Sequence, residues 1–238
     1  MPKKGAKIPK SAKRAKQRGK KASKRDYTSP ARLRQILAAL DKLFPNAECA
    51  LHHANAFQLL VATILSAQCT DERVNKVTPA LFEKYPTPQD FASLNPEVLA
   101  EEIRSTGFFR NKAKSITGAA KRIVTDFGGQ VPRSMEELLP LPGVARKTAN
   151  VVLGTAYGIS SGIVVDTHVF RVSHRLKLSL ATSPEKMEQD LMKLVPKDRW
   201  ISFGHQVIWF GRKVCQARKP LCATCPIEEI CDAPDKTV

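Results

Sequence analysis

Four cysteines near the end of the sequence have the spacing of a metal-binding segment. Cys215, Cys222, Cys225 and Cys231 follow the pattern Cys-x6-Cys-x2-Cys-x5-Cys. Four thiolates on one short segment can hold a tetrahedral zinc ion or a [4Fe–4S] cube. Structural zinc sites usually pair their ligands in two short hooks, whereas this pattern contains one such hook. The spacing therefore favours an iron–sulfur cluster and leaves zinc as the alternative.

A lysine and an aspartate earlier in the chain could carry covalent chemistry. Lys147 lies just after a Pro-Gly pair, and Asp166 follows a later apolar run. A lysine amine is a nucleophile once it has lost its proton, and a carboxylate nearby can act as a base or stabilise positive charge. The simpler interpretations are a solvated surface charge for Lys147 and a helix N-cap for Asp166. A cap and a catalytic carboxylate are compatible, so the pair is a candidate active site.

The segment before Lys147 predicts a tight connection between two helices. Pro142 sets a turn, and Gly143 supplies backbone freedom where the chain bends. The next helix then begins with free N–H groups, and such groups bind phosphate without contacting a base. A plain helix–helix connection is the alternative. The candidate phosphate-binding residues of this segment are Gly143, Val144, Ala145, Arg146 and Thr148.

The elements that must position these residues are predicted to be helices. Apolar residues recur at helical spacing, and the one β-branched run, at 163–165, is short. We therefore predict an all-α chain. A first helix opens at Ser29-Pro30 and ends at Phe44-Pro45. The further predicted helices span 56–65, 72–85, 88–93, 96–105, 111–127, 134–139, 144–158, 167–176, 184–195 and 200–213.

Positive charge is concentrated at the N-terminus. The formal net charge is +17, and 12 of the 39 basic residues lie in the first 25 positions, which contain no acid. Such a segment has little apolar surface to bury, so we predict that residues 1–26 form a disordered basic tail. A tail of this kind is attracted to polyanions such as nucleic acids. A solubilising or localisation tail is the alternative.

The remaining composition fits a globular protein that works in a reducing compartment. Hydrophobic residues make up 42% of the 238 positions, which is enough for a core. No apolar run is long enough to span a bilayer, and no apolar stretch follows the N-terminal charges as in a secretory signal. We expect no membrane partner and a cytoplasmic, nucleoid-associated location in a bacterium, with the nucleus as the alternative. Clustered thiols then indicate metal ligands rather than disulfides.

Four motifs in a fixed order make the sequence resemble the endonuclease III family of DNA glycosylase/AP lyases. The resemblance runs from about Ser29 to Cys231. The cysteine spacing matches the [4Fe–4S] loop of that family. The other three motifs are Leu-Ser-Ala-Gln at 65–68 with Thr70-Asp71, Leu-Pro-Gly-Val-Ala-Arg-Lys-Thr-Ala-Asn at 141–150, and Val-Asp-Thr-His at 165–168.

The resemblance implies a two-lobed helix-hairpin-helix glycosylase fold with a DNA-binding cleft between the lobes. One lobe would be a six-helix barrel at 49–160 that contains the hairpin. The other would be the cluster-containing helical lobe, formed by 27–48 and 161–238. The implied cofactor is a [4Fe–4S] cluster on the four cysteines. The implied partner is double-stranded DNA with damaged bases or abasic sites, bound by a monomer.

The resemblance also implies roles for single residues. Lys147 matches the Schiff-base lysine of the family and Asp166 its catalytic aspartate. Gln68 matches the residue that fills the gap left by an extruded nucleotide. Phe108 stands where the family has an apolar wedge, usually aliphatic, and a partly buried core aromatic is the alternative. Ala145 stands where the family often has a second hairpin glycine. Three further residues are expected near DNA, namely His168, Arg218 and Lys219.

The implied activity is removal of oxidised pyrimidines from duplex DNA in base excision repair. A lysine Schiff base and β-elimination would follow base loss. A monofunctional mismatch or damage glycosylase is one alternative, although such relatives lack the lysine at position 147. A non-catalytic DNA-binding protein is another, and the pairing of Lys147 with Asp166 argues against it.

Overall fold

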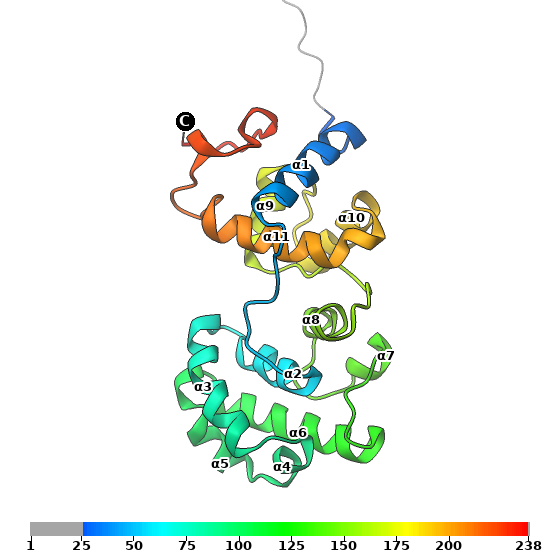
Figure 1. The fold of residues 1–238 in the computed structure, drawn as a ribbon, viewed down its shortest axis with the longest axis vertical. Helices are drawn as coiled ribbons and strands as arrows, with labels where there is room; N and C mark the ends of the chain where they lie inside the picture. The colour runs from blue at the N-terminus through cyan, green and yellow to red at the C-terminus, as the bar shows by residue number, and fades with distance from the viewer. Residues whose placement is uncertain (1–25, 238) are drawn as a thin grey trace, which may run out of the picture.

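The computed structural model describes residues 26–237. Within that range the chain folds into α-helices and short 3-10 helices without a strand, which confirms the predicted all-α class (Figure 1). The basic tail predicted at 1–26 lies outside the described residues, except for Asp26. None of the described helices is both long and apolar enough to cross a membrane.

The α-helices fall close to the predicted segments. They are α1 (Pro30–Leu43), α2 (Ala56–Leu65), α3 (Asp71–Lys84), α4 (Pro88–Ser93), α5 (Pro96–Glu102), α6 (Phe109–Phe127), α7 (Met135–Leu138), α8 (Arg146–Tyr157), α9 (Thr167–Arg175), α10 (Pro184–Leu194) and α11 (Trp200–Lys213). The 3-10 helices are η1 (Arg104–Thr106), η2 (Lys197–Arg199), η3 (Cys222–Thr224) and η4 (Glu228–Ile230).

Side-chain caps explain where several helices start. The Oδ1 atom of Asn55 accepts a hydrogen bond from the Gln58 N–H at 3.0 Å at the start of α2. Several predicted boundaries were wrong by one to three residues, and two of these differences have a local explanation. The helix predicted from 144 begins at Arg146, because Ala145 is extended with φ −90° and ψ 168°. The helix predicted to 105 ends at Glu102, after which the chain tightens into η1.

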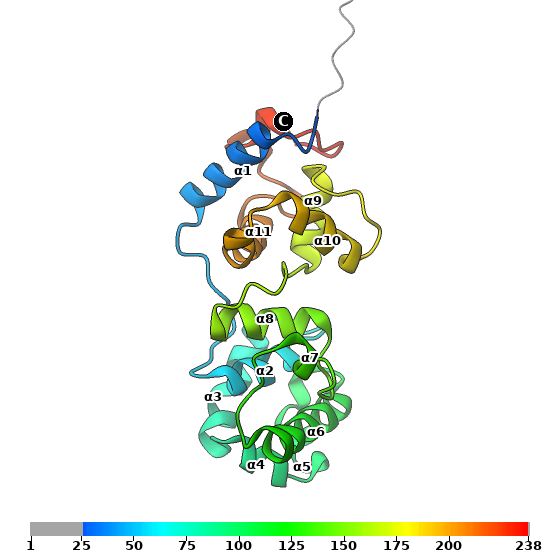
Figure 2. The same ribbon diagram turned by 90° about the vertical axis from the view of Figure 1, so that its right-hand side faces the viewer.

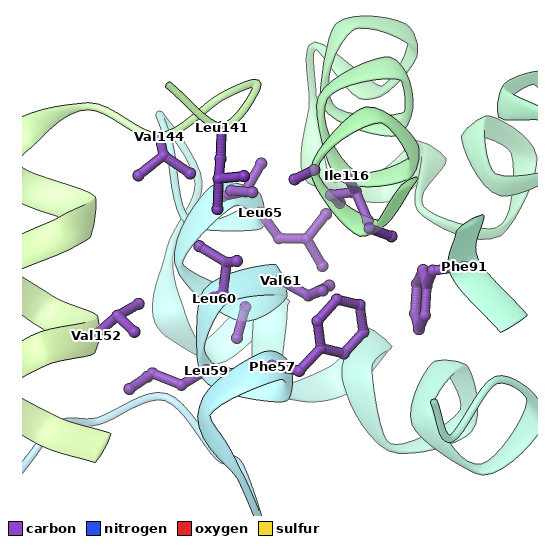
Figure 3. Packing of buried hydrophobic residues seen from close by; sticks show 14 of the residues in the cluster. Phe57, Leu59, Leu60, Val61, Leu65, Phe91, Ile116, Leu141, Val144 and Val152 are labelled. Atoms are coloured by element: carbon purple, nitrogen blue, oxygen red, sulfur yellow. The ribbon is translucent and has the colours of Figure 1, made fainter. Parts of the chain in front are cut away.

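The lower lobe in Figure 1 contains α2 to α8 around one hydrophobic core. Helix α2 lies at its centre, and Phe57 packs edge-on against Phe91 with ring centres 5.3 Å apart. Leu141 and Val144, from the turn before α8, pack near Leu65 in the same core (Figure 3). This burial fixes the turn to α2 and so fixes the start of α8.

The upper lobe contains α1, α9, α10 and α11 around a second core (Figures 1 and 2). The described part of the chain therefore begins and ends in the same lobe. It crosses to the lower lobe between α1 and α2 and returns between α8 and α9. Large side chains that fill this core include Ile36, Leu40, Val169, Val172, Met187, Leu191, Phe203 and Phe210.

A buried carboxylate joins the two lobes at the start of α8. Glu188 of α10 is 5% exposed and accepts hydrogen bonds from Arg146 Nε at 2.8 Å and Asn150 Nδ2 at 2.8 Å. The returning chain passes this carboxylate at Gly162, where a Cβ atom would lie 2.0 Å from Glu188 Oε1. A larger residue there would have to displace the Glu188 carboxylate, so glycine leaves this contact between α8 and α10 undisturbed.

Candidate active site

The turn before α8 has the geometry of a tight hairpin between two helices. Gly143 has φ +76°, and a Cβ atom there would lie 2.6 Å from Ser115 Cβ, so both conformation and space require glycine. Val144 is buried, and its N–H donates to Leu141 O at 3.1 Å. Ala145 keeps a negative φ and provides no side-chain cap, which leaves the first N–H groups of α8 without a side-chain acceptor.

Lys147 and Asp166 line the same cleft between the lobes. Lys147 is the second residue of α8 and is exposed, whereas Asp166 is half-buried at the start of α9. Both residues line two adjoining pockets, which we call the interlobe cleft. The cleft is also lined by Ser66, Asp71 and Arg212. The structure thus brings together an amine and a carboxylate that lie on separate helices.

The two oxygens of the Asp166 carboxylate have different surroundings. Oδ1 accepts hydrogen bonds from the backbone N–H groups of His168 and Val169, each at 2.8 Å, and so caps α9. Within the described part of the chain, Oδ2 receives no hydrogen bond. One oxygen therefore holds the helix while the other stays available in the cleft.

An ion pair bridges the lobes on one side of the cleft. Arg212 of α11 donates to Asp71, the first residue of α3, and each side chain is about a quarter exposed. The guanidinium also lies over the Trp209 ring, 5.4 Å from its centre. Partial burial makes this pair less screened than a surface salt bridge. It ties the end of α11 to the segment that carries Gln68.

Three titratable groups that line the cleft have pKa values shifted by burial. Burial lowers the pKa of His168, although the nearby charge of Asp166 acts to raise it. The backbone N–H of His168 donates a hydrogen bond to the same carboxylate. Burial also lowers the pKa of His205 and raises the pKa of the Cys49 thiol. These three groups therefore favour their neutral forms, so the formal charges that line the cleft come mainly from carboxylates, lysine and arginine.

Two exposed residues of the lower lobe have unusual backbone conformations. Gln68 has φ +52° and Phe108 has φ +47°, values that residues other than glycine rarely adopt. Phe108 is 64% exposed, which excludes the core-aromatic alternative. Gln68 lines the interlobe cleft, and Phe108 follows Gly107, itself at φ +70°.

The four cysteines of the C-terminal segment line one cavity in the upper lobe. Its walls include Phe210, Leu221 and Ile227 alongside Cys215, Cys222, Cys225 and Cys231. Within residues 26–237, no three His, Cys, Asp or Glu side chains converge closely enough to hold a single metal ion. The four cysteines therefore share one largely apolar cavity.

Arginines of α9 hold the cysteine segment in place. Arg175 is 8% exposed and donates to Gln216 O at 2.7 Å and to Cys215 Sγ at 3.4 Å. Arg171 donates to Cys215 O at 3.0 Å. Arg218 and Lys219 lie on the same segment with exposed side chains.

Comparison with known proteins assigns the chain to a family. The profile described as HhH-GPD superfamily base excision DNA repair protein matches residues 61–197. Endonuclease III of Synechocystis sp. is 58% identical over 200 residues, which cover 84% of this chain and 91% of that protein. Endonuclease III of Bacillus subtilis is 50% identical over 203 residues, which cover 84% and 92%. The chain belongs to the endonuclease III family.

Solved structures agree with this membership. A structure of a non-covalent endonuclease III–DNA complex matches with a TM-score of 0.82 at 47% identity, covering 86% of this chain and 95% of that chain. A trapped endonuclease III–DNA covalent intermediate also matches with a TM-score of 0.82, at 46% identity, covering 86% and 96%. The predicted family and the helix-hairpin-helix fold are confirmed.

The structure adds contacts of the site residues that the sequence motifs do not reveal. Arg146 was a predicted DNA contact, but its guanidinium donates to Glu188, so it would offer DNA its backbone N–H. The Asp71–Arg212 pair joins residues 141 positions apart. No local signal marks such a partner. Thr148, another predicted phosphate contact, follows Lys147 in α8 and is half-buried.

Proposed function

We propose that this protein is a bifunctional DNA glycosylase/AP lyase of base excision repair that removes oxidised pyrimidines from duplex DNA. The observation that carries the proposal is the shared position of Lys147 and Asp166 in the interlobe cleft. As a monomer in the cytoplasm it would act on damaged bases and abasic sites. The two matched endonuclease III–DNA structures support DNA as the partner.

Lys147 is the proposed nucleophile. Its amine, once deprotonated, attacks C1′ of the damaged nucleotide, and the C1′–N bond breaks as the base leaves with the electron pair. The sugar ring opens and the amine forms a Schiff base at C1′. That cation acidifies the C2′ proton, whose removal by a base drives β-elimination. The C3′–O bond then breaks, and the strand is cut on the 3′ side.

Asp166 is the proposed carboxylate partner of the amine. Its Oδ1 atom is occupied by the two backbone N–H groups that begin α9, which fixes the orientation of the carboxylate. Its Oδ2 atom can then help to deprotonate the nucleophile and stabilise positive charge developing on the sugar. The cap therefore positions the catalytic group.

We assign DNA binding to residues that surround the cleft. The turn and the first residues of α8, from Gly143 through Thr148, would bind a phosphate through N–H groups other than that of Val144, which is bonded to Leu141 O. Gln68 and Phe108 would enter the duplex, because an enzyme that works on a base must extrude it from the stack. Lobes at 49–160 and at 27–48 with 161–238 would grip the strands from both sides. His168, Arg218 and Lys219 would add contacts near the backbone.

We propose a [4Fe–4S] cluster held by the four cysteines. The common cavity, its apolar walls and the Arg175 donor beside Cys215 Sγ support this assignment. The cluster would supply structural cross-linking that fixes the segment with Arg218 and Lys219. Purified protein should contain iron and acid-labile sulfide in equal amounts, with broad visible absorption. Stoichiometric zinc without iron would contradict the assignment.

A panel of defined duplexes tests the proposed activity. We expect strand cleavage at thymine glycol, dihydrouracil and an abasic site, and far less at 8-oxoguanine. Base release without strand cleavage would indicate a monofunctional glycosylase. Binding of every duplex without base release or cleavage would indicate a non-catalytic DNA-binding protein. Undamaged duplex of the same sequence is the control.

A further inference from the structure

A buried lysine in the lower lobe bonds to two carbonyl oxygens from separate segments. Lys112 of α6 is 5% exposed. Its Nζ atom donates to Leu65 O at 2.8 Å and to Thr106 O at 2.7 Å. Burial lowers the pKa of this lysine. A cation is rarely buried against neutral carbonyls, because desolvation is costly.

The two carbonyls belong to the segments that carry Gln68 and Phe108. Leu65 is the last residue of α2 and lies three positions before Gln68. Thr106 ends η1 and lies two positions before Phe108. Lys112 is 47 positions from Leu65 in sequence, so its ammonium joins segments that no local interaction could hold together.

Backbone strain is concentrated just beyond the same two carbonyls. Among residues 26–237, positive φ angles outside glycine occur at Gln68, Phe108 and Lys177. Such conformations persist where the surrounding structure determines them, and they gather at functional positions. Two of the three thus follow a carbonyl that Lys112 holds. An ammonium that only capped the end of α2 would not need the second bond to Thr106.

We propose that Lys112 is a positioning residue that sets the separation and orientation of Gln68 and Phe108, so that both enter the duplex as one unit. This inference rests on the proposed function, in which those two side chains replace the extruded nucleotide. Lys112 itself does not touch DNA. Both acceptors of its ammonium are backbone oxygens, so the distance between the two segments is set without any acceptor side chain that DNA could displace.

The Lys112→Met variant tests the proposal, because methionine keeps a similar length but cannot donate. Single-turnover cleavage of a thymine glycol duplex should fall by about 10²-fold, as expected when a distant change misplaces reacting groups. The fluorescence rise of 2-aminopurine placed opposite the lesion, which reports unstacking, should be lost. Affinity for undamaged duplex, set mainly by phosphates, should change by less than about twofold.

Two comparison variants sharpen the test. Lys121→Met removes an exposed lysine from the same helix and should change neither rate nor fluorescence. Lys112→Arg keeps donors and should restore part of both signals. If Lys112→Met does not fold, Lys112→Gln replaces it in the test. The fluorescence rise should then be largest for wild type, smaller for Lys112→Arg and smallest for Lys112→Gln. Affinity for undamaged duplex should be the same in all three.

Specific outcomes would overturn the inference. An unchanged rate and fluorescence in Lys112→Met, or no graded order among the folded variants, would show that the lysine only caps α2. An equal loss of cleavage, fluorescence and affinity for undamaged duplex would show a general structural defect. If wild type cleaves none of the damaged duplexes, the proposed function fails first and the inference fails with it.

Discussion

Replacing Lys147 with alanine is expected to lower strand cleavage at an abasic site by at least about 10³-fold, the scale seen when an enzyme loses its nucleophile. Borohydride should trap a covalent adduct with wild-type protein and none with Lys147→Ala. The reason is that no Schiff base forms without the amine. Because Lys147 is exposed, its removal should change the free energy of unfolding by no more than about 0.5 kcal/mol.

The matched control for this experiment is Lys193→Ala. Lys193 is an exposed lysine near the end of α10 and does not line the interlobe cleft. Its variant should form the adduct at the wild-type yield. An adduct of undiminished yield in Lys147→Ala would reject Lys147 as the nucleophile.

Replacing Asp166 with asparagine should separate catalysis from folding. The amide oxygen can accept the two N–H bonds that begin α9, and asparagine is as good an N-cap as aspartate. Stability should therefore stay near wild type. The single-turnover rate on a thymine glycol duplex should fall by about 10²- to 10⁴-fold, because the amide cannot take a proton or carry negative charge.

Alanine at the same position should add a loss of stability. Asp166→Ala removes the cap as well as the carboxylate and should cost about 1 kcal/mol in urea unfolding beyond the asparagine variant. Ser183→Ala is the control, since Ser183 caps α10 by accepting from Lys186 N. It should lose similar stability and keep its activity. Wild-type rates in Asp166→Asn would show that the aspartate is a cap only.

The elements of this fold that depend on local sequence were predictable. Helices α2 and α11 have the predicted bounds, because apolar periodicity and flanking turn signals are encoded within each segment. Lys147 and Asp166 were found for a similar reason, since each lies at a helix start marked by its neighbours. The resemblance to a family then joined these local features into one site.

Interactions between distant segments could not be predicted. The Arg212–Asp71 pair, the Glu188 contacts with α8 and the Lys112 bonds all join residues from different helices. Each depends on how the helices pack in three dimensions, and no spacing along the chain records that. Phe108 stayed ambiguous between core and surface for the same reason, until its left-handed backbone and 64% exposure placed it outside the core.

The position of α1 has a consequence for the order in which the protein can be assembled during synthesis. Arg32 of α1 donates to Ile230 O at 3.0 Å, across 198 positions of sequence. The lower lobe can bury its core once residues up to α8 have left the ribosome, because its members end at Leu153. Helix α1 is made before all of them, but it packs on α11, and its Arg32 donates to Leu176 O and Ile230 O. Each new chain therefore carries an unpartnered amphipathic helix until synthesis is nearly complete, and a chain that stops before Ile230 would lose Cys231 together with this anchor.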